Sequence, residues 1–223
     1  AARGAVDFLM WVVTGISTGL TQGFSIQLSQ YYGAKDFENL RKSLAHSYRL
    51  TAFIAAGVLI LSQSFASLVL TGLHTPSNII GMSLLYLRII FCGIPATAAY
   101  NMFASALRAM GNSKTPLTAM IIASVLNVSL DILFVAGFGW GVAGAAIATV
   151  IAQSFSAVYC FLILRRIDIV HLTRADFMPA SGMNARLMKL GIPVVFQNII
   201  IGVGGLVVQY VINGYGFLFL AGF

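Results

Sequence analysis

Six long apolar segments, joined by short polar connections, constrain the fold of this chain more than any other feature. They lie at about residues 8–32, 50–73, 82–107, 116–138, 141–164 and 190–213. Each has at least the roughly 20 residues that a helix needs to cross a bilayer. Backbone inside lipid must satisfy its own hydrogen bonds, and none of the segments alternates as a barrel strand does. The sequence therefore predicts an all-α fold, a polytopic transmembrane helix bundle with six spans.

Composition excludes the main alternative classes of protein. Only 9% of the 223 residues are charged, and 59% are hydrophobic, whereas an ordinary soluble domain has about a quarter charged residues. The net charge of +7 would suggest nucleic acid for a soluble protein, but in so apolar a chain basic residues mark the flanks of membrane spans. We therefore expect the lipid bilayer as a partner and no nucleic acid. Cys92 and Cys160 lie inside apolar segments, so no disulfide framework or metal-ligand spacing exists.

The basic residues are distributed unevenly over the connections. Eleven of the 13 lie in or beside residues 33–49, 108–115 and 165–189. The connections at 74–81 and 139–140 contain none, and the exceptions are Arg3 and Arg88. The positive-inside rule then predicts that the three basic loops are cytoplasmic, with both ends of the chain on the outer side of the plasma (inner) membrane.

The connection over 165–189 divides the chain unequally. It is polar and contains Pro179, Ser181 and Gly182, which is typical of a linker between two bundles, although a long loop within one bundle fits as well. Five spans precede it and one follows. We expect a first-lobe helix bundle over 1–164 that lacks its opening helix, a cytoplasmic linker over 165–189, and the first helix of a truncated second lobe over 190–223.

Asp131 is the only acidic residue well inside a span. A carboxylate there costs on the order of 3 kcal/mol to insert, so it calls for a functional reason. Asn127 precedes it by one helical turn on the same face. Counted from the tight turn at Trp140, Asp131 and Thr149 are equidistant, as are Asn127 and Gln153. An antiparallel helix pair would place each couple at one depth, which predicts two polar layers.

A carboxylate, an amide and a hydroxyl together offer hard oxygen ligands. We therefore predict a cation-binding site at Asp131, Asn127 and Thr149, which would take Na⁺ or exchange H⁺. The structural alternative is a protonated Asp131 that bonds Thr149 and only holds the helices together. No other cofactor is expected.

Other residues in the spans predict helix contacts and a kink. Two spans carry small residues at four-residue spacing, which favours close helix packing in lipid. These residues are Gly15, Gly19 and Gly23, and Gly144, Ala148 and Ala152. Pro95 should kink its helix because it removes a backbone hydrogen bond. Asn101 and Gln153 are candidate cavity-lining residues.

The sequence contains no catalytic constellation. It has no Ser/His/Asp set, no glycine-rich phosphate loop with its Lys, and no paired carboxylates or His residues inside the spans. We therefore expect that the protein is not an enzyme.

Several motifs resemble those of the multidrug and toxic compound extrusion (MATE) transporter family. They are Gln30–Asp36 (QYYGAKD), Ala106–Pro116 (ALRAMGNSKTP), Asn127–Asp131 (NVSLD), Gly139–Thr149 (GWGVAGAAIAT) and Leu190–Pro193 (LGIP). The resemblance extends over essentially the whole chain, which would correspond to helices two to seven of the family's twelve. The missing opening helix agrees with the division of the chain proposed above.

The resemblance implies secondary active antiport, in which a Na⁺ or H⁺ gradient drives export of amphipathic organic compounds or drugs by a protein that is monomeric when full length. In sodium-coupled members an Asp of helix one, an Asn and an Asp of helix five and a Thr of helix six bind the cation. Asn127, Asp131 and Thr149 match the last three, and the helix-one Asp has no counterpart here. Some members carry a carboxylate on helix seven, but residues 190–213 contain none, which disfavours proton coupling through such a residue.

Two other functions remain open. A lipid-linked oligosaccharide flippase of the same superfamily would need Arg or Lys deep in its cavity, whereas Arg88 and Arg108 lie near the membrane faces. A non-transporting membrane subunit would not need Asp131. If the chain is a fragment, we expect it to be inactive as a pump by itself.

Overall fold

The computed structural model describes the backbone of residues 2–72 and 80–214. The predicted connection at 74–81 and the end of the predicted second-lobe segment lie largely outside the described residues. In chain order the elements are α1 (Ala2–Gly33), α2 (Phe37–Gly72), α3 (Ile80–Cys92), α4 (Ile94–Ala109), α5 (Lys114–Asp131), the π-helix η1 (Ile132–Gly137), α6 (Gly141–Arg165), the 3₁₀ helices η2 (Asp168–Val170) and η3 (Arg174–Phe177), and α7 (Met183–Gly214).

The prediction of an all-α membrane bundle is confirmed. Within the described ranges, five segments are long and apolar enough to cross a membrane, namely Phe37–Ala66, Ile80–Ala109, Lys114–Gly137, Gly141–Arg165 and Met183–Gly205. The predicted span at 8–32 is not among them. The first part of that segment lies among residues whose side chains the structure does not describe, and its helix, α1, packs against α2, α4 and α7.

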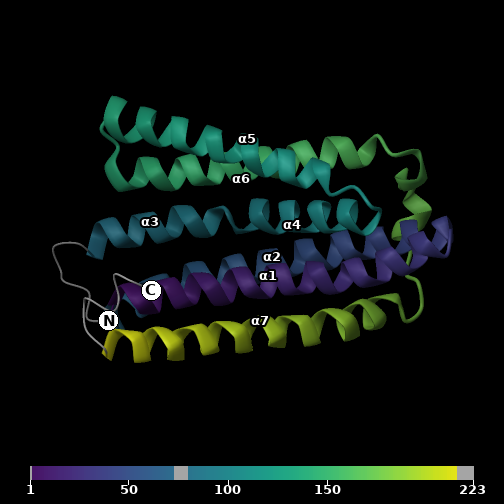
Figure 1. The fold of residues 1–223 in the computed structure, drawn as a ribbon, viewed down its shortest axis with the longest axis horizontal. Helices are drawn as coiled ribbons and strands as arrows, with labels where there is room; N and C mark the ends of the chain where they lie inside the picture. Colours follow the sequence, from purple (N-terminus) through teal and green to yellow (C-terminus); the bar gives the residue numbers. More distant parts are fainter. Residues whose placement is uncertain (1, 73–79, 215–223) are drawn as a thin grey trace.

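The helices run roughly parallel to one another in layers (Figure 1). α7 packs on α1, α1 and α2 pack on α4, and α6 joins α3 and α4 to α5. The connections at residues 34–36, 110–113 and 166–182 gather at one end, here called the basic end. The α5–α6 turn at residues 138–140 lies at the other, here called the Trp140 end, together with the start of α1 and the end of α7 (Figure 1). This arrangement agrees with the alternation predicted from the loop charges.

Two connections at the basic end are shorter than predicted. α2 begins at Phe37, so most of the expected loop 33–49 is helix. α7 begins at Met183, which leaves residues 166–182 between α6 and α7 instead of 165–189. Hydropathy did not predict these two helix starts, because a helix can extend beyond the apolar segment into water when its end is capped. Asp36 caps α2, accepting hydrogen bonds from the Asn39 backbone (3.2 Å) and side chain (2.7 Å).

The predicted kink at Pro95 is a break between two helices. α3 ends at Cys92, and Pro95 lies in the first turn of α4, where its missing N–H costs nothing. Gly93 occupies the junction, and a Cβ there would come within 2.9 Å of Val150 Cγ2 on α6. The break therefore also permits close approach of α6.

The predicted glycine contacts on α1 are confirmed, and their partner is α7. A Cβ on Gly19 would lie 2.8 Å from the Val195 Cα, and one on Gly23 would overlap the Gly191 backbone. On α6 the predicted stripe of Gly144, Ala148 and Ala152 is buried, with Gly144 against Phe134. Small residues thus allow two helix pairs to approach at backbone distance.

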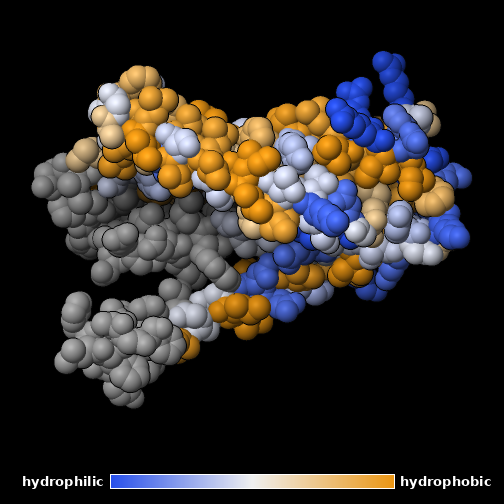
Figure 2. Space-filling model, turned by 45° about the horizontal axis from the view of Figure 1, so that its top comes forward, coloured by the Kyte–Doolittle hydropathy of each residue, from blue (hydrophilic) through white to orange (hydrophobic). Residues whose placement is uncertain are grey.

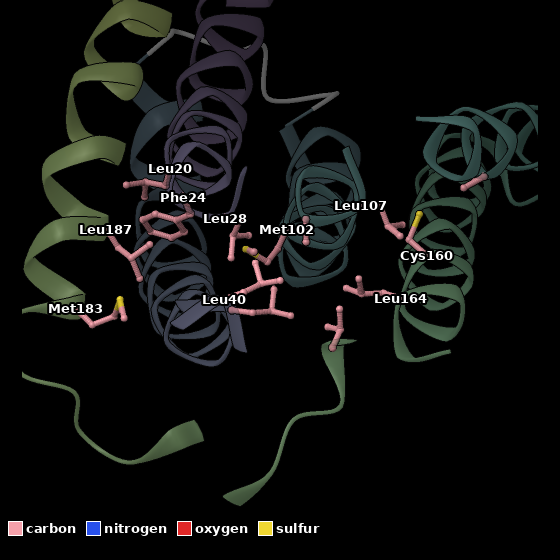
Figure 3. Packing of buried hydrophobic residues seen from close by; sticks show 14 residues of the cluster. Leu20, Phe24, Leu28, Leu40, Met102, Leu107, Cys160, Leu164, Met183 and Leu187 are labelled. Atoms are coloured by element: carbon pink, nitrogen blue, oxygen red, sulfur yellow. The ribbon is translucent and has the colours of Figure 1, made fainter. Parts of the chain in front are cut away.

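Buried apolar side chains gather toward the basic end (Figure 3). Leu20, Phe24 and Leu28 of α1 meet residues of four other helices, including Leu40, Leu44, Met102, Leu107, Cys160, Leu164, Met183 and Leu187. Figure 2 shows the complementary surface, where apolar side chains cover the flank of the bundle and hydrophilic residues collect at one end. This distribution is expected of helices whose flanks face lipid and whose charged turns face water.

Polar side chains fasten residues 166–182 to α2. His46 is 2% exposed, and its Nε2 donates to the Met178 carbonyl at 3.1 Å while its Nδ1 lies 2.7 Å from the Asn184 side-chain amide. Arg49 donates to the Phe177 carbonyl at 3.0 Å. The connection is therefore held against the bundle. Whether it also separates two lobes stays a prediction.

Candidate cation site

The predicted site residues lie on the hairpin formed by α5, η1 and α6. Asn127 and Asp131 belong to the last turns of α5, and Thr149 and Gln153 to the first half of α6. All four side chains are half-buried. The hairpin occupies one side of the bundle, and its tip is the Trp140 end (Figure 1). The four residues thus lie on two adjacent antiparallel helices, as the sequence predicted, and Asn127 and Thr149 are in direct contact.

One direct hydrogen bond connects the two helices at this site. Asn127 Nδ2 donates to Thr149 Oγ1 at 3.4 Å, and the Thr149 hydroxyl donates to the Ala145 carbonyl at 3.0 Å. The Asn127 amide oxygen is therefore not needed for the contact between helices. It can accept a further bond or coordinate a cation.

The register of this contact differs from the prediction. Counting from Trp140 placed Thr149 opposite Asp131 and Gln153 opposite Asn127, whereas the structure bonds Thr149 to Asn127. The count assumed regular α-helix up to the turn, whereas the π-helix η1 follows Asp131 directly. Its i→i+5 hydrogen bonds widen the helix, so the last turns of α5 are displaced relative to an uninterrupted α-helix.

Asp131 is the atypical member of the group. Its Oδ1 is shielded from solvent and has no hydrogen-bond partner among the described residues, so the predicted alternative bond to Thr149 is absent. A carboxylate oxygen that is shielded from solvent is stabilised by a hydrogen-bond donor, a proton or a cation. The ion pairs among the described residues do not include Asp131, and all of them lie at the basic end.

The available donors fit a small hard cation. Asp131, Asn127 and Thr149 offer a carboxylate, an amide and a hydroxyl oxygen, which are groups that hard cations prefer. In the part of the chain that the structure describes, no cluster of three His, Cys, Asp or Glu residues exists. A single carboxylate with neutral oxygens suits one monovalent charge better than a multivalent ion.

The two candidate cavity residues lie in different places. Asn101 donates from Nδ2 to Thr18 Oγ1 at 3.2 Å, which joins α4 to α1. Gln153 lies on α6, one helical turn after Thr149. A cavity of about 390 Å³ instead lies between α2, α4 and α6 and is lined by Pro95, Ala99, Met102, Tyr48 and Phe161. Its wall is almost wholly apolar, and neither Asn101 nor Gln153 lines it.

Sequence reasoning missed the π-helix and the aromatic cap beside it. Phe134 stacks on Trp140 with 5.0 Å between ring centroids, and Phe138 lies 5.4 Å from Trp140. Gly139 and Gly141 both have positive φ, 69° and 54°, which permits the tight turn between them. The spacing of these glycines and aromatics was the available signal. It indicates a turn but does not reveal an extra residue in the preceding helix.

Comparison with known proteins identifies the family. A family model described as MatE matches residues 1–133. The chain belongs to the MatE family. It is 31% identical over 222 residues to the probable multidrug resistance protein YpnP of Bacillus subtilis, covering 100% of this chain and 50% of that protein. It is 25% identical to the multidrug export protein MepA of Staphylococcus saprophyticus, covering 92% of this chain and 46% of MepA.

Solved structures show the same fold. A crystal structure of MATE in complex with MaD5 has a TM-score of 0.89 at 22% identity and covers 99% of this chain and 51% of that one. An inward-facing and an outward-facing MATE family transporter each have a TM-score of 0.82, at 23% and 22% identity. These matches cover 89% and 91% of this chain and 46% of each transporter chain. This MatE chain spans about half the length of the relatives that it matches, and its fold resembles the corresponding half in both conformations.

Proposed function

We propose that the protein carrying this chain is a secondary active antiporter, in which an inward Na⁺ or H⁺ gradient drives export of amphipathic organic compounds. Membership in the MatE family supports this, as do relatives named as multidrug resistance and multidrug export proteins. Small organic molecules are the transported partners, and the full-length protein works as a monomer.

The observation that carries the proposal is the partnerless Oδ1 of Asp131 beside the Asn127–Thr149 bond. In the proposed cycle Asp131 binds Na⁺, or a proton in its place, with Asn127 and Thr149 as further oxygen donors. Loading of the cation neutralises the carboxylate, which removes the cost of a buried charge. Because the site adjoins a π-helix, a small change in its occupancy can alter the packing of the α5–α6 hairpin.

The orientation of the protein is also part of the proposal. The basic loops at 33–49, 108–115 and 165–189 face the cytoplasm, and the Trp140 end faces outward across the plasma membrane. Reaction of Cys introduced at Lys35 and at Gly139 with an impermeant thiol reagent in intact cells tests this. The orientation predicts that only the Cys at position 139 reacts.

Dye efflux tests the assignment of Asp131. The full-length protein is reconstituted in vesicles, and Na⁺ and H⁺ gradients are imposed separately. Asp131→Asn should reduce gradient-driven efflux to the rate seen without a gradient, because the amide offers no charge for the cation. Ser129→Ala is the matched control on the same helix, since the Ser129 hydroxyl only donates to its own helix at the Val125 carbonyl. Efflux by Asp131→Asn at the wild-type rate would show that another group couples transport to the gradient.

A further inference from the structure

Two buried hydroxyl groups face a small void between α1 and α2, away from the candidate cation site. Ser17 is 8% exposed and Thr51 is 9% exposed, and neither Ser17 Oγ nor Thr51 Oγ1 has a hydrogen-bond partner. Ser43 and Ser47 of α2 are also buried without a hydrogen-bond partner, but neither lines this void, and several other Ser and Thr hydroxyls of α1 and α2 donate to their own helix. Thr21, for example, donates to the Ser17 and Thr18 carbonyls at 3.1 and 3.0 Å. Partnerless buried hydroxyls are uncommon in folded proteins and indicate a missing partner.

The void is deep in the helix bundle. Ser17 lies 16 residues before the end of α1, and Thr51 lies 14 residues after the start of α2, which places both about 20–25 Å along their helices from the basic end. Apolar side chains, including Leu20, Ile54 and Val58, complete the wall. Thr51 also borders the cavity of about 390 Å³ between α2, α4 and α6, whose wall is almost wholly apolar.

The size and the polar groups of the void fit one water molecule. Its volume is about 10 Å³, close to the lower limit for holding a single water. Ser17, Thr21 and Thr51 all line it. Because the Thr21 hydroxyl proton is engaged with backbone carbonyls, its oxygen remains free to accept. Three polar partners are the usual number for a buried water.

We propose that this void binds one structural water molecule, which bridges Ser17 and Thr51 and donates to Thr21. The bridge connects α1 to α2 inside the membrane-spanning part of the bundle. One residue further along α1, Thr18 accepts the hydrogen bond from Asn101 of α4. Adjacent polar contacts would thus fix α1 to α2 and to α4, at a level where lipid offers no alternative partners.

A double-mutant cycle tests the water. Ser17→Ala and Thr51→Val each delete one hydroxyl while keeping the helix and nearly the same side-chain shape. In the full-length protein, each single variant should lower the midpoint of thermal unfolding by a few degrees, because the other hydroxyl loses its bridge. The double variant should lower the midpoint by no more than the single variant with the smaller effect, because neither hydroxyl is then left without a partner.

The control cycle uses Ser124→Ala and Thr118→Val on α5. Both hydroxyls are exposed and donate to their own helix, at the Met120 and Lys114 carbonyls. These variants should have small effects that add. If Ser17→Ala and Thr51→Val leave the midpoint unchanged or raise it, and their effects add, the void is dry and the proposal is wrong.

A structure of the full-length protein at a resolution that shows ordered waters provides the second measurement. Density within hydrogen-bond distance of Ser17, Thr21 and Thr51 is expected in the wild type and should be absent from the double variant. Coupling between the two substitutions without such density would mean that the hydroxyls bond each other directly, which also contradicts the proposal.

Discussion

The two ends of the bundle differ in how their side chains are packed. At the basic end, apolar side chains from five helices are fully buried together, and His46, Arg41 and Arg49 bind residues 166–182 to α2. At the Trp140 end, α5 and η1 bury few side chains, and Val125, Val128 and Ile132 are 64%, 58% and 63% exposed. The comparison sets an end held by a buried apolar core against an end whose carboxylate has an oxygen without a partner among the described residues.

This contrast has a physical basis. In lipid, exposed apolar side chains cost nothing, so the hairpin needs no core to be stable within the membrane. Helix contacts there depend on small residues and on a few polar bonds. An element attached in this way can shift with the charge of its site, whereas a close-packed core cannot deform gradually.

The largest expected difference between the ends concerns the core. Leu44 is 1% exposed, so Leu44→Ala should lower the free energy of unfolding by about 2–5 kcal/mol. Val128→Ala on the exposed face of α5 should change it by no more than about 0.5 kcal/mol. Unfolding of the purified protein, followed by circular dichroism, measures both. Equal losses would mean that the two ends contribute alike to stability.

The second prediction concerns the attachment of residues 166–182. His46→Ala leaves the Met178 carbonyl and the Asn184 amide without partners, which should cost about 2–3 kcal/mol and increase proteolysis between Arg166 and Met183. His171→Ala is the matched control, because the His171 side chain is 66% exposed. Unchanged proteolysis of the His46 variant would show that this connection is held by other contacts.

The third prediction addresses the Trp140 end. Saturating Na⁺ should raise the free energy of unfolding of the wild type by about 1–3 kcal/mol through linkage. Asp131→Asn should lose this dependence while keeping, or slightly increasing, its stability without Na⁺, because a buried charge is removed. Thermal unfolding with Na⁺ and with choline at constant ionic strength measures the effect. A Na⁺ response in the Asn variant equal to that of the wild type would place the cation elsewhere.

The smallest expected effect lies in the cap of α2. Hydrogen bonds from the Asn39 side chain and backbone lower the pKa of Asp36 below its ordinary value of 3.8. The ionised cap therefore stabilises the fold above that value, and its contribution is lost as the pH falls through the lowered pKa. Asn39→Ala should destabilise the protein slightly near neutral pH and less in acid. A stability difference that is independent of pH would exclude this carboxylate as its source.

Much of the architecture could be predicted because lipid leaves few choices. The apolar segments, the charges of the loops, the break at Pro95 and the close contact of Gly19 and Gly23 each follow from local sequence. The boundaries at Phe37 and Met183 could not be predicted from hydropathy, because capping and packing against neighbouring segments decide where a helix ends outside the membrane.

The candidate site shows the same division. Asp131, Asn127 and Thr149 were identifiable because a carboxylate inside a span requires a reason, and polar residues one turn apart share a helix face. Their pairing was not identifiable, because counting from the turn assumes regular α-helix, whereas residues 132–137 form a π-helix and the Asn127–Thr149 bond depends on how α5 and α6 pack.

By itself, the sequence determined that this protein is a bundle of membrane helices, which of its ends is basic, and which acidic residue lies well inside a span. These properties depend on hydropathy and charge, which act residue by residue. Only the tertiary structure decided that Thr149 bonds Asn127, that Asp131 Oδ1 is left without a partner, and that the hydroxyls of Ser17 and Thr51 line one void. Those facts depend on contacts between helices, where a displacement of one residue exchanges one partner for another.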